Sequence, residues 1–340
     1  MGRAPQNVVE WPQTLEGYVP RNLLNRREVI ASIAAATAAA ALPRLLSAAP
    51  APVLDFLIVG DWGRNGTNHQ REVAAQMGRT ADSVGGRFVV SVGDNFYENG
   101  VESPSDPQWR LSYEDIYSAR SLQIPWYVAL GNHDYRGAPQ AQIDYSKTSP
   151  RWRMPSRYYK VPGSDLGAPH LDLFVIDTSP LVHQYRENVH SVIAENVASQ
   201  DVTAQLHWLD EELAKSAAAW KLVVGHHTIY SGGDHGNTPE TVQLIEPLLR
   251  KHRVQAYING HDHDLQHIRR GGVDYICCGA GSEVRPVRPV EGTRFYRGQP
   301  GFAAMRSNPD ELTVEFRDFT GASLYRSSIP REGKAVSRAA

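Results

Sequence analysis

The chain has 340 residues, with 35 lysines and arginines against 37 aspartates and glutamates, which gives a net charge of −2. This balance excludes a basic protein that coats nucleic acid, and the 41% hydrophobic content excludes coiled coil, collagen and wholesale disorder. A chain of this length buries a substantial core without cross-links. Its two cysteines, Cys277 and Cys278, are adjacent and cannot link distant segments.

The first 49 residues resemble an export signal of the twin-arginine type. Paired arginines at 26 and 27 precede an uncharged, Ala-rich stretch at 29–42, which is too short to span a bilayer. Small residues follow at 47–51, as they do at signal-peptidase sites. A surface helix ended by Pro43 and an uncleaved signal anchor are the alternatives.

Three parts are therefore expected: a signal peptide and linker at 1–49, one domain at 50–331 and a flexible tail at 332–340. Removing residues 1–49 takes away five arginines and three glutamates, which leaves 30 basic and 34 acidic residues and a net charge of −4. No later run approaches about 18 apolar residues, so no stable membrane anchor is expected. The predicted location is periplasmic or secreted, and the export machinery is an expected partner.

Five times along the chain, a short apolar run ends in a glycine that is followed by a potential metal ligand. Buried strands covered on both faces are expected at 56–59, 88–92, 126–130, 221–224 and 256–259. The runs end in Gly60-Asp61, Gly93-Asp94, Gly131-Asn132, Gly225-His226 and Gly260-His261. Glycine at each exit lets the backbone turn sharply and approach a site closely.

Helical patterns lie between the strands, at 69–81, 203–219 and 239–252, where Pro247 is expected to kink the last helix. Strands that alternate with helices predict an α/β fold, in which residues at the carboxyl ends of the strands meet in one crevice. The segment from 273 to 329 is strand-rich and contains a Thr320-Gly321 hairpin turn. We expect it to form part of a second sheet, packed on the first within the same domain.

The candidate metal ligands are Asp61, Asp94, Tyr97, Asn132, His226, His261 and His263. Oxygen and imidazole donors without thiolate suit iron, manganese or zinc. Seven donors are too many for one four-coordinate site and fit two metals that share a bridge. Three anionic ligands cannot neutralise a trivalent and a divalent ion together, even with a hydroxide added. The pocket would stay positive, as a phosphate ester requires.

These motifs resemble the five metal motifs of the purple acid phosphatases, which belong to the calcineurin-like metallophosphoesterases. The resemblance rests on Gly60-Asp61-Trp62-Gly63, Gly93-Asp94 with Tyr97, Gly131-Asn132-His133, Gly225-His226 and Gly260-His261-Asp262-His263. It is closest to the small, tartrate-resistant type, because only the predicted signal precedes the first motif. It covers residues 53 to 330 and implies two packed mixed β-sheets flanked by helices, in a four-layer α/β/β/α arrangement.

The resemblance also implies an activity and assigns the ligands. Fe(III) would be held by Asp61, Asp94, Tyr97 and His263, and Fe(II), Zn or Mn by Asn132, His226 and His261, with Asp94 bridging both ions. A metal-bound hydroxide would attack phosphate monoesters, and the leaving group would take a proton from His133 or His235. Small phosphorylated molecules are the expected substrates, with phosphoproteins as an alternative and no nucleic acid binding.

Several features stay open at this point. His227 stands where the family commonly has an aromatic or small residue, and it fits either a further acid or ligand or a structural role. The loop 285–297 carries four arginines that suit either a phosphate grip or a solvated loop. His267 is expected to be structural, and Trp62, Phe96 and Trp126 are expected to pack in the core. A phosphodiesterase or nucleotidase using Mn or Zn and a non-catalytic iron-binding protein are the alternative functions.

Overall fold

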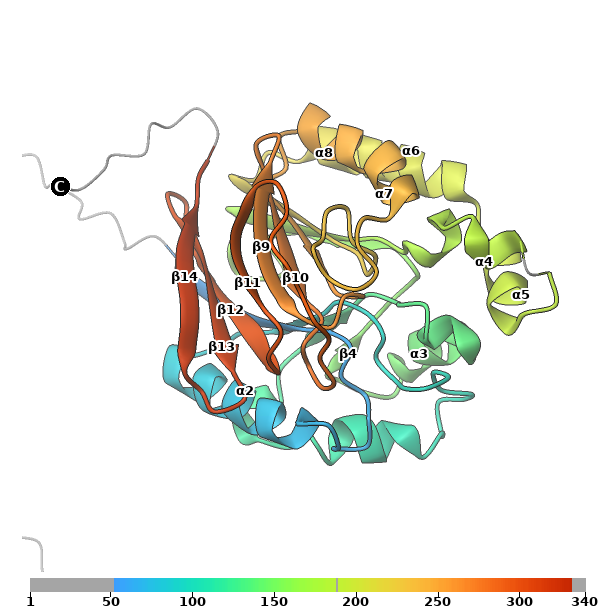
Figure 1. The fold of residues 1–340 in the computed structure, drawn as a ribbon. Coiled ribbons are helices and arrows are strands. Elements are labelled where there is room, and N and C mark those ends of the chain that lie inside the picture. Colours follow the sequence, from blue (N-terminus) through green and yellow to red (C-terminus); the bar gives the residue numbers. More distant parts are fainter. Residues whose placement is uncertain (1–51, 188, 332–340) are drawn as a thin grey trace, which may run out of the picture. The chain divides into compact units, whose positions relative to one another are not determined.

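The computed structural model describes residues 52–187 and 189–331, and within them two seven-stranded sheets pack against each other (Figure 1). The predicted signal and linker at 1–49 and the predicted tail at 332–340 lie outside the described residues. Both sheets combine parallel and antiparallel strands, and helices lie on their outer faces. The predicted arrangement of two packed mixed sheets with flanking helices is confirmed.

The first sheet contains the strands in the order β14-β13-β12-β1-β2-β3-β4. Their bounds are β1 (Leu54–Val59), β2 (Val89–Ser91), β3 (Trp126–Val128), β4 (Trp152–Arg153), β12 (Gly301–Ser307), β13 (Leu312–Asp318) and β14 (Ser323–Ile329). Strands β1 to β4 run parallel, and β12 pairs antiparallel with β1. Every residue of β1 is buried, in agreement with the apolar run at 56–59 that forms most of the strand.

The second sheet has the order β11-β9-β10-β8-β7-β6-β5. Its strands are β5 (Tyr159–Val161), β6 (Leu171–Val175), β7 (Trp220–Val224), β8 (Ala256–Asn259), β9 (Leu265–Arg270), β10 (Val273–Cys278) and β11 (Thr293–Arg297). Strands β6, β7, β8 and β10 are parallel neighbours. The second sheet therefore has a parallel centre with antiparallel strands on both sides. The first sheet has antiparallel strands on one side only, at β12, β13 and β14.

Seven α-helices and four 3₁₀- or π-helical turns connect the described strands. The α-helices are α2 (Gln70–Val84), α3 (Pro139–Tyr145), α4 (Gln184–Glu187), α5 (Val192–Ala198), α6 (Val202–Lys215), α7 (Pro239–Leu244) and α8 (Glu246–Lys251). The turns are η1 (Trp109–Glu114), η2 (Arg120–Leu122), η3 (Asp134–Arg136) and η4 (Ser179–Leu181). The three predicted helices are found, and the last is divided at Ile245, two residues before Pro247.

The helices cover opposite outer faces of the two sheets (Figure 1). α2 contacts β1 and β12 in the first sheet. Leu209 and Leu213 of α6 and Leu249 of α8 share an apolar cluster with residues of the second sheet. Apolar side chains at helical spacing thus face the sheet, which is the usual way in which an amphipathic helix buries its apolar stripe.

An aromatic cluster fills the core beside the first sheet. Trp62, Phe96 and Trp126 are fully buried, and the Trp62 ring lies edge-on to both of the others. The Trp62 indole donates a 2.8 Å hydrogen bond to the Ser91 hydroxyl, so its one polar atom is satisfied. The predicted packing role of these aromatic residues is confirmed, and the cluster supports the loops that carry the first two ligand motifs.

The prediction for the C-terminal strands was wrong in one respect. Residues 312–329 do not join a separate second sheet, because β12 pairs with β1 and carries β13 and β14 into the first sheet. Of this segment, β10 does lie in the second sheet as predicted, where it runs parallel to β8. The five strands that end in candidate ligands are therefore shared between the sheets, with three in the first and two in the second.

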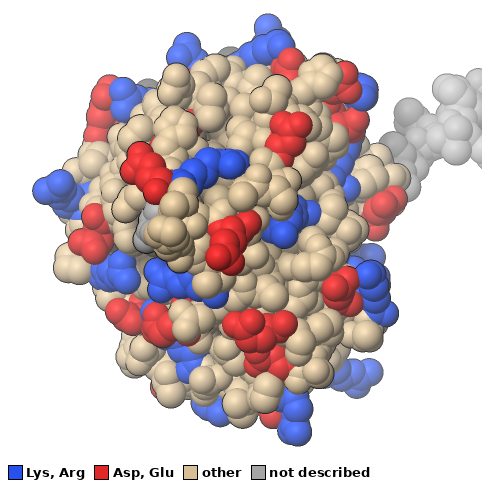
Figure 2. All heavy atoms as spheres, turned by 90° about the vertical axis from the view of Figure 1, so that its right-hand side faces the viewer, with Lys and Arg blue, Asp and Glu red and all other residues tan. Residues whose placement is uncertain are grey.

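Acidic and basic side chains are interspersed over the face shown in Figure 2. Within the described residues, none of the helices is both long and apolar enough to cross a membrane. Cys277 and Cys278 are both free thiols buried in β10, so the described fold is held without a disulfide between them. Its stability depends on the buried core and on hydrogen bonds.

Candidate metal centre

The seven candidate ligands gather where strands of the two sheets end. From the first sheet, Asp61 follows β1, Asp94 and Tyr97 follow β2, and Asn132 follows β3. From the second sheet, His226 follows β7, and His261 and His263 follow β8. All seven are buried, with at most 9% of their surface exposed. The structure therefore brings together every ligand that the sequence predicts.

The backbone at these strand ends is strained and closely packed. Asp61, Asp94 and His261 have φ angles of 58°, 50° and 70°, in the left-handed region that costs a non-glycine residue about 1–3 kcal/mol. A Cβ on Gly131 would lie 2.2 Å from Asp94 Oδ1, and one on Gly260 would lie 2.2 Å from Asp61 Oδ2. The glycines before the ligands are thus required for close approach, as the sequence predicts.

The first cluster of ligands surrounds the phenolic oxygen of Tyr97. This oxygen lies 3.1 Å from Asp61 Oδ1, 3.1 Å from Asp94 Oδ2 and 3.0 Å from His263 Nε2. A phenol has one proton, so it can donate to only one of these three neighbours. A metal ion with four ligands satisfies all of these donor atoms at once, and the four residues fit such an ion.

The second cluster surrounds Nε2 of His226. This nitrogen lies 3.2 Å from Asn132 Oδ1, 3.4 Å from Asp94 Oδ1 and 3.3 Å from His261 Nδ1. The other ring nitrogen, Nδ1, lies 2.9 Å from the carbonyl oxygen of Val92, which can only accept a hydrogen bond. His226 therefore carries a proton on Nδ1 and directs Nε2 toward the cluster, as metal-ligating histidines do.

Asp94 belongs to both clusters. Its Oδ2 faces Tyr97, and its Oδ1 faces His226 and also accepts a 2.8 Å hydrogen bond from the backbone N–H of His133. Ligand atoms of Asp61, Asp94 and His226 lie within 4.8 Å of one another. One carboxylate with an oxygen in each cluster is the geometry expected for a group that bridges two metal ions.

The ionisation of the buried carboxylates depends on the charged groups around them. Burial raises the pKa of Asp61 well above its usual value. The neighbouring Asp94 raises this pKa further, and His226 lowers it. Burial opposes ionisation of Asp94 too, but the neighbouring His226 holds the pKa of Asp94 well below its usual value. Burial lowers the pKa of His226, but Asp94 outweighs it and brings the value to about 9. A positive charge beside it, on a protonated His226 or on a metal ion bound by the neutral imidazole, thus keeps the Asp94 carboxylate charged.

The two predicted proton donors lie at the edge of the ligand clusters. His133 Nδ1 donates to the carbonyl oxygen of Glu98 at 2.7 Å, and its Nε2 lies 3.9 Å from Asp94 Oδ2. The ring of His235 stacks on that of His261, with 4.1 Å between the centroids and 20° between the planes. Arg285 donates to His235 Nε2 at 3.0 Å, so this nitrogen carries no proton in the arrangement seen.

A cavity of about 510 Å³ opens beside the second cluster. Asn132 and His261 form part of its wall, together with His235. The remaining lining residues are Arg136, Val182, Gln184, Tyr185, His227, Asn237, Thr238, Pro239 and Glu240. A cavity of this size holds a small ligand and places it against the candidate ligands of the second cluster.

Comparisons with known proteins agree with this geometry. Residues 54–265 match the calcineurin-like phosphoesterase family. Purple acid phosphatase 7 of Arabidopsis thaliana is 40% identical over 288 residues, which cover 82% of this chain and 86% of the relative. Tartrate-resistant acid phosphatase type 5 of Homo sapiens is 36% identical over 314 residues, which cover 86% of this chain and 95% of the relative. The chain belongs to the purple acid phosphatase family.

Solved structures share this fold. The structure described as "GAP50 the anchor in the inner membrane complex of Plasmodium" is similar with a TM-score of 0.71 and 26% identity, covering 83% of this chain and 90% of that chain. Purple acid phosphatase PPD1 of Lupinus luteus has a TM-score of 0.63 and 17% identity, and 54% of its length is covered. The lupin enzyme supports the fold alone.

One residue that organises the centre of this purple acid phosphatase family member, Asp134, was not predicted from the sequence. Asp134 accepts hydrogen bonds from the backbone N–H groups of Asn95 and Gly131 and from the Gln142 side chain. Burial raises the pKa of Asp134 to about 7, and Asp94 contributes to this shift. Its position directly after the third motif is the one signal that could have identified it as a residue that organises the ligand loops.

The segment 285–297 consists of a loop followed by a strand. Arg285 reaches His235, whereas residues 293–297 form the edge strand β11. His267 is buried and bonded to Asp274 at 2.7 Å and to Tyr325 at 3.1 Å, which confirms its predicted structural role.

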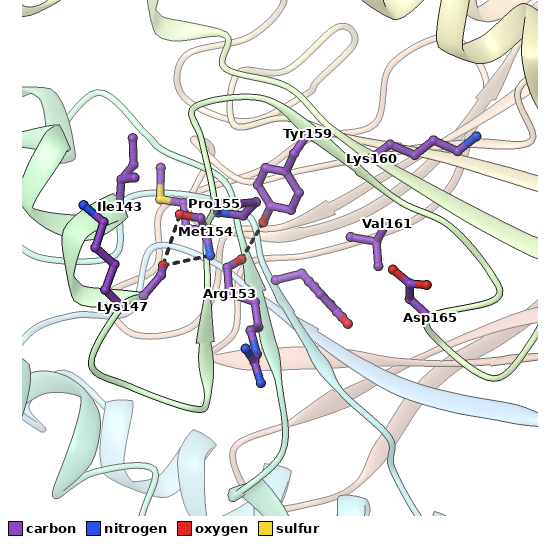
Figure 3. Close-up of a pocket in the computed structure, with 11 residues that line it drawn as sticks. Ile143, Lys147, Arg153, Met154, Pro155, Tyr159, Lys160, Val161 and Asp165 are labelled. Atoms are coloured by element: carbon purple, nitrogen blue, oxygen red, sulfur yellow. Dashed lines mark hydrogen bonds between the residues drawn. The ribbon is translucent and has the colours of Figure 1, made fainter.

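A second cavity, of about 380 Å³, lies between the edge strands β4 and β5 (Figure 3). None of the candidate ligands lines it. Its lysines are paired with acidic residues, Lys147 with Asp144 at 2.6 Å and Lys160 with Asp172 at 3.1 Å. Figure 3 shows Lys147, Arg153 and Lys160 pointing in different directions. The positive groups therefore do not converge on a common anion.

Asp177, after β6, gives the fold a specific dependence on pH. It accepts hydrogen bonds from the Tyr135 hydroxyl and from the Ser179 N–H, and burial raises its pKa from 3.8 to about 6. Between pH 4 and 6 the folded state therefore binds more protons at this site than the unfolded state. Its contribution to stability falls as the pH rises through this window.

Replacing Asp177 with asparagine should remove this contribution to the pH dependence. The free energy of unfolding of Asp177→Asn, relative to the wild-type protein, should rise by about 2–3 kcal/mol between pH 4 and pH 7. Urea denaturation of both proteins at a series of pH values measures the difference. Parallel pH profiles for the two proteins would show that Asp177 does not titrate in this range.

Proposed function

We propose that this protein is an acid phosphatase that hydrolyses phosphate monoesters at a dinuclear Fe(III)–M(II) centre, in which M(II) is Fe(II), Zn or Mn. One observation carries the proposal: the seven ligands divide into two clusters, one on each oxygen of Asp94, and one cluster contains the Tyr97 phenol. Membership of the purple acid phosphatase family supports the same activity.

The two clusters differ in the kind of ion that they suit. The first contains Asp61, Asp94, Tyr97 and His263, and its anionic oxygens favour a hard trivalent ion such as Fe(III). The second contains Asn132, His226 and His261, and its mostly neutral donors suit a divalent ion. When bound, the two ions would lower the pKa of water and stabilise negative charge on the phosphoryl group.

His133 is the group best placed to give a proton to the departing alcohol. Its Nδ1–H is committed to the Glu98 carbonyl, so Nε2 is the nitrogen that can exchange a proton with a substrate. Burial lowers the pKa of His133, although Asp94 acts in the opposite direction. The imidazole therefore releases a proton more readily than an exposed histidine does, which suits a general acid at acidic pH.

His235 and Arg285 form a second donor pair at the same edge. Burial lowers the pKa of His235, and the Arg285 guanidinium opposes its protonation further. The side chain of Arg285 is 30% exposed and can instead bind a phosphoryl oxygen. Binding of a substrate would thus free His235 Nε2 to carry a proton, which makes His235 the alternative acid.

Substrate, partners and location are part of the proposal. We propose small phosphorylated molecules as substrates, with phosphoproteins as an alternative, because the cavity of about 510 Å³ suits a small ligand. The net charge of −2 favours a protein without nucleic acid partners. Export to the periplasm or the medium through a twin-arginine signal stays a prediction, since residues 1–49 lie outside the described residues.

Two other functions use the same fold. A phosphodiesterase or nucleotidase with Mn or Zn would also use a dinuclear site, and a non-catalytic iron-binding protein would keep the ligands without turnover. The similarity to a structure described as an anchor is the one observation that favours a non-enzymatic role. The preservation of both candidate acids beside the ligands favours catalysis.

Turnover of two substrates distinguishes these functions. The metal-loaded protein should hydrolyse 4-nitrophenyl phosphate at acidic pH far faster than bis(4-nitrophenyl) phosphate. His133→Gln should lower kcat by about 100-fold or more for an alkyl monoester, whose alkoxide needs a proton, and less for the nitrophenyl ester. His207→Gln, on the exposed face of α6, is the matched control. Faster diester hydrolysis would favour the phosphodiesterase, and no turnover would favour the binding protein.

The visible spectrum tests the predicted role of Tyr97. A phenolate bound to Fe(III) gives a broad charge-transfer band, so the purified iron-loaded protein should be coloured and Tyr97→Phe should lose the band. Tyr158→Phe is the matched control, because Tyr158 packs against Trp208 outside the ligand clusters. A band that is unchanged in Tyr97→Phe would contradict the assignment of Tyr97 as a ligand.

A further inference from the structure

Three side chains form a continuous chain of hydrogen bonds at the wall of the 510 Å³ cavity. Thr178 follows β6, His227 follows the ligand His226, and Tyr185 lies in α4. Thr178 Oγ1 is 2.8 Å from His227 Nδ1, and His227 Nε2 is 2.9 Å from the Tyr185 hydroxyl. His227 and Tyr185 both line the cavity. Neither Thr178 nor Tyr185 is among the predicted site residues.

The hydrogen bonds of Thr178 fix the direction of this chain. Its hydroxyl oxygen accepts from the backbone N–H of His226 at 3.3 Å and from that of His227 at 3.0 Å. A hydroxyl oxygen has two lone pairs, and these two bonds use both. The Thr178 oxygen therefore cannot also accept from the imidazole. It must donate its own proton to His227 Nδ1.

The tautomer of His227 follows from this count. With Nδ1 as an acceptor, the imidazole carries its proton on Nε2 and donates it to the oxygen of Tyr185. The reverse direction would give the Thr178 oxygen three donors and leave its own proton without an acceptor among the described residues. A doubly protonated imidazole is excluded for the same reason, because it too would donate to Thr178.

We infer that Thr178 and His227 turn the Tyr185 hydroxyl into a hydrogen-bond donor that is aimed at the phosphoryl group of a substrate in this cavity. The oxygen of Tyr185 accepts from His227, and no other described residue takes the Tyr185 proton. The O–H bond is left to face the cavity that Tyr185 lines. The inference deepens the proposed function and rests on it, because that function makes this cavity the substrate site.

The surroundings of Tyr185 suit this role. Asn132 and His261, from the second ligand cluster, line the same cavity as Tyr185, and so does Arg136. A phosphoryl group held at the second cluster would present its anionic oxygens to this wall. Burial raises the pKa of Tyr185, and Asp94 adds to the shift, so the phenol keeps its proton at the working pH. Tyr185 would touch the substrate, whereas Thr178 and His227 are positioning residues.

Binding of inorganic phosphate to the metal-loaded protein tests the inference. Tyr185→Phe should raise the Kd of phosphate by about 10- to 100-fold, the usual loss for a hydrogen bond to a charged group. His227→Phe should raise the Kd in the same direction but by no more than Tyr185→Phe does, since the Tyr185 hydroxyl keeps its proton but loses the hydrogen bond that orients it, and His227→Gln should stay within about threefold of the wild-type protein. Isothermal titration gives the Kd, and metal content and Tm should not change.

The double variant shows whether the residues act as one unit. Tyr185→Phe combined with His227→Phe should bind phosphate no more weakly than Tyr185→Phe alone. Losses that multiply, or an unchanged Kd in Tyr185→Phe, would overturn the inference. Tyr185→Phe alone decides the outcome if His227→Phe loses metal, because Tyr185 is not a ligand. Failure of the wild-type protein to hydrolyse monoesters would instead overturn the proposed function, while phosphate binding still tests Tyr185.

Discussion

The site depends on one buried carboxylate that two groups of ligands share. Asp94 places one oxygen against the Tyr97 phenol and the other against His226, at the junction of the two sheets. Placing Asp61, Asp94 and Tyr97 together away from water is costly unless positive charge is bound among them. The left-handed backbone at Asp61 and Asp94 and the close approach of Gly131 are consequences of packing these anions together.

The protein holds this arrangement with hydrogen bonds that cross between the sheets. The Val92 carbonyl, after β2, orients the His226 ring from the second sheet. Asp61, after β1, accepts from the backbone N–H of His261, again across the sheets. Thr178, after β6, accepts a hydrogen bond from the backbone of the turn after β7. Through His227 the hydrogen bonds continue to Tyr185 at the wall of the 510 Å³ cavity. The candidate metal ligands and the proposed substrate contact are thus positioned by one network.

The sequence was sufficient to predict that the candidate ligands lie together, because a buried strand, a glycine and a polar residue recur together at five strand ends. It also predicted the α/β class and the main helices, whose apolar spacing is regular. It could not assign β13 and β14 to the first sheet. These strands follow β12, which pairs with β1 although the two strands are more than 240 residues apart in the sequence. The roles of Asp134 and Tyr185 depend on contacts between distant loops, which leave no local pattern.

The number of metal ions per chain tests the central claim most directly. Metal analysis of the purified protein, alongside Asp94→Asn, measures whether the two ligand clusters each hold an ion and whether Asp94 joins them. Two ions per wild-type chain are expected, with at least one lost from Asp94→Asn, because an amide cannot supply a bridging carboxylate. A wild-type protein that binds a single ion, or an Asp94→Asn variant that keeps both with unchanged affinity, would contradict the shared-carboxylate centre.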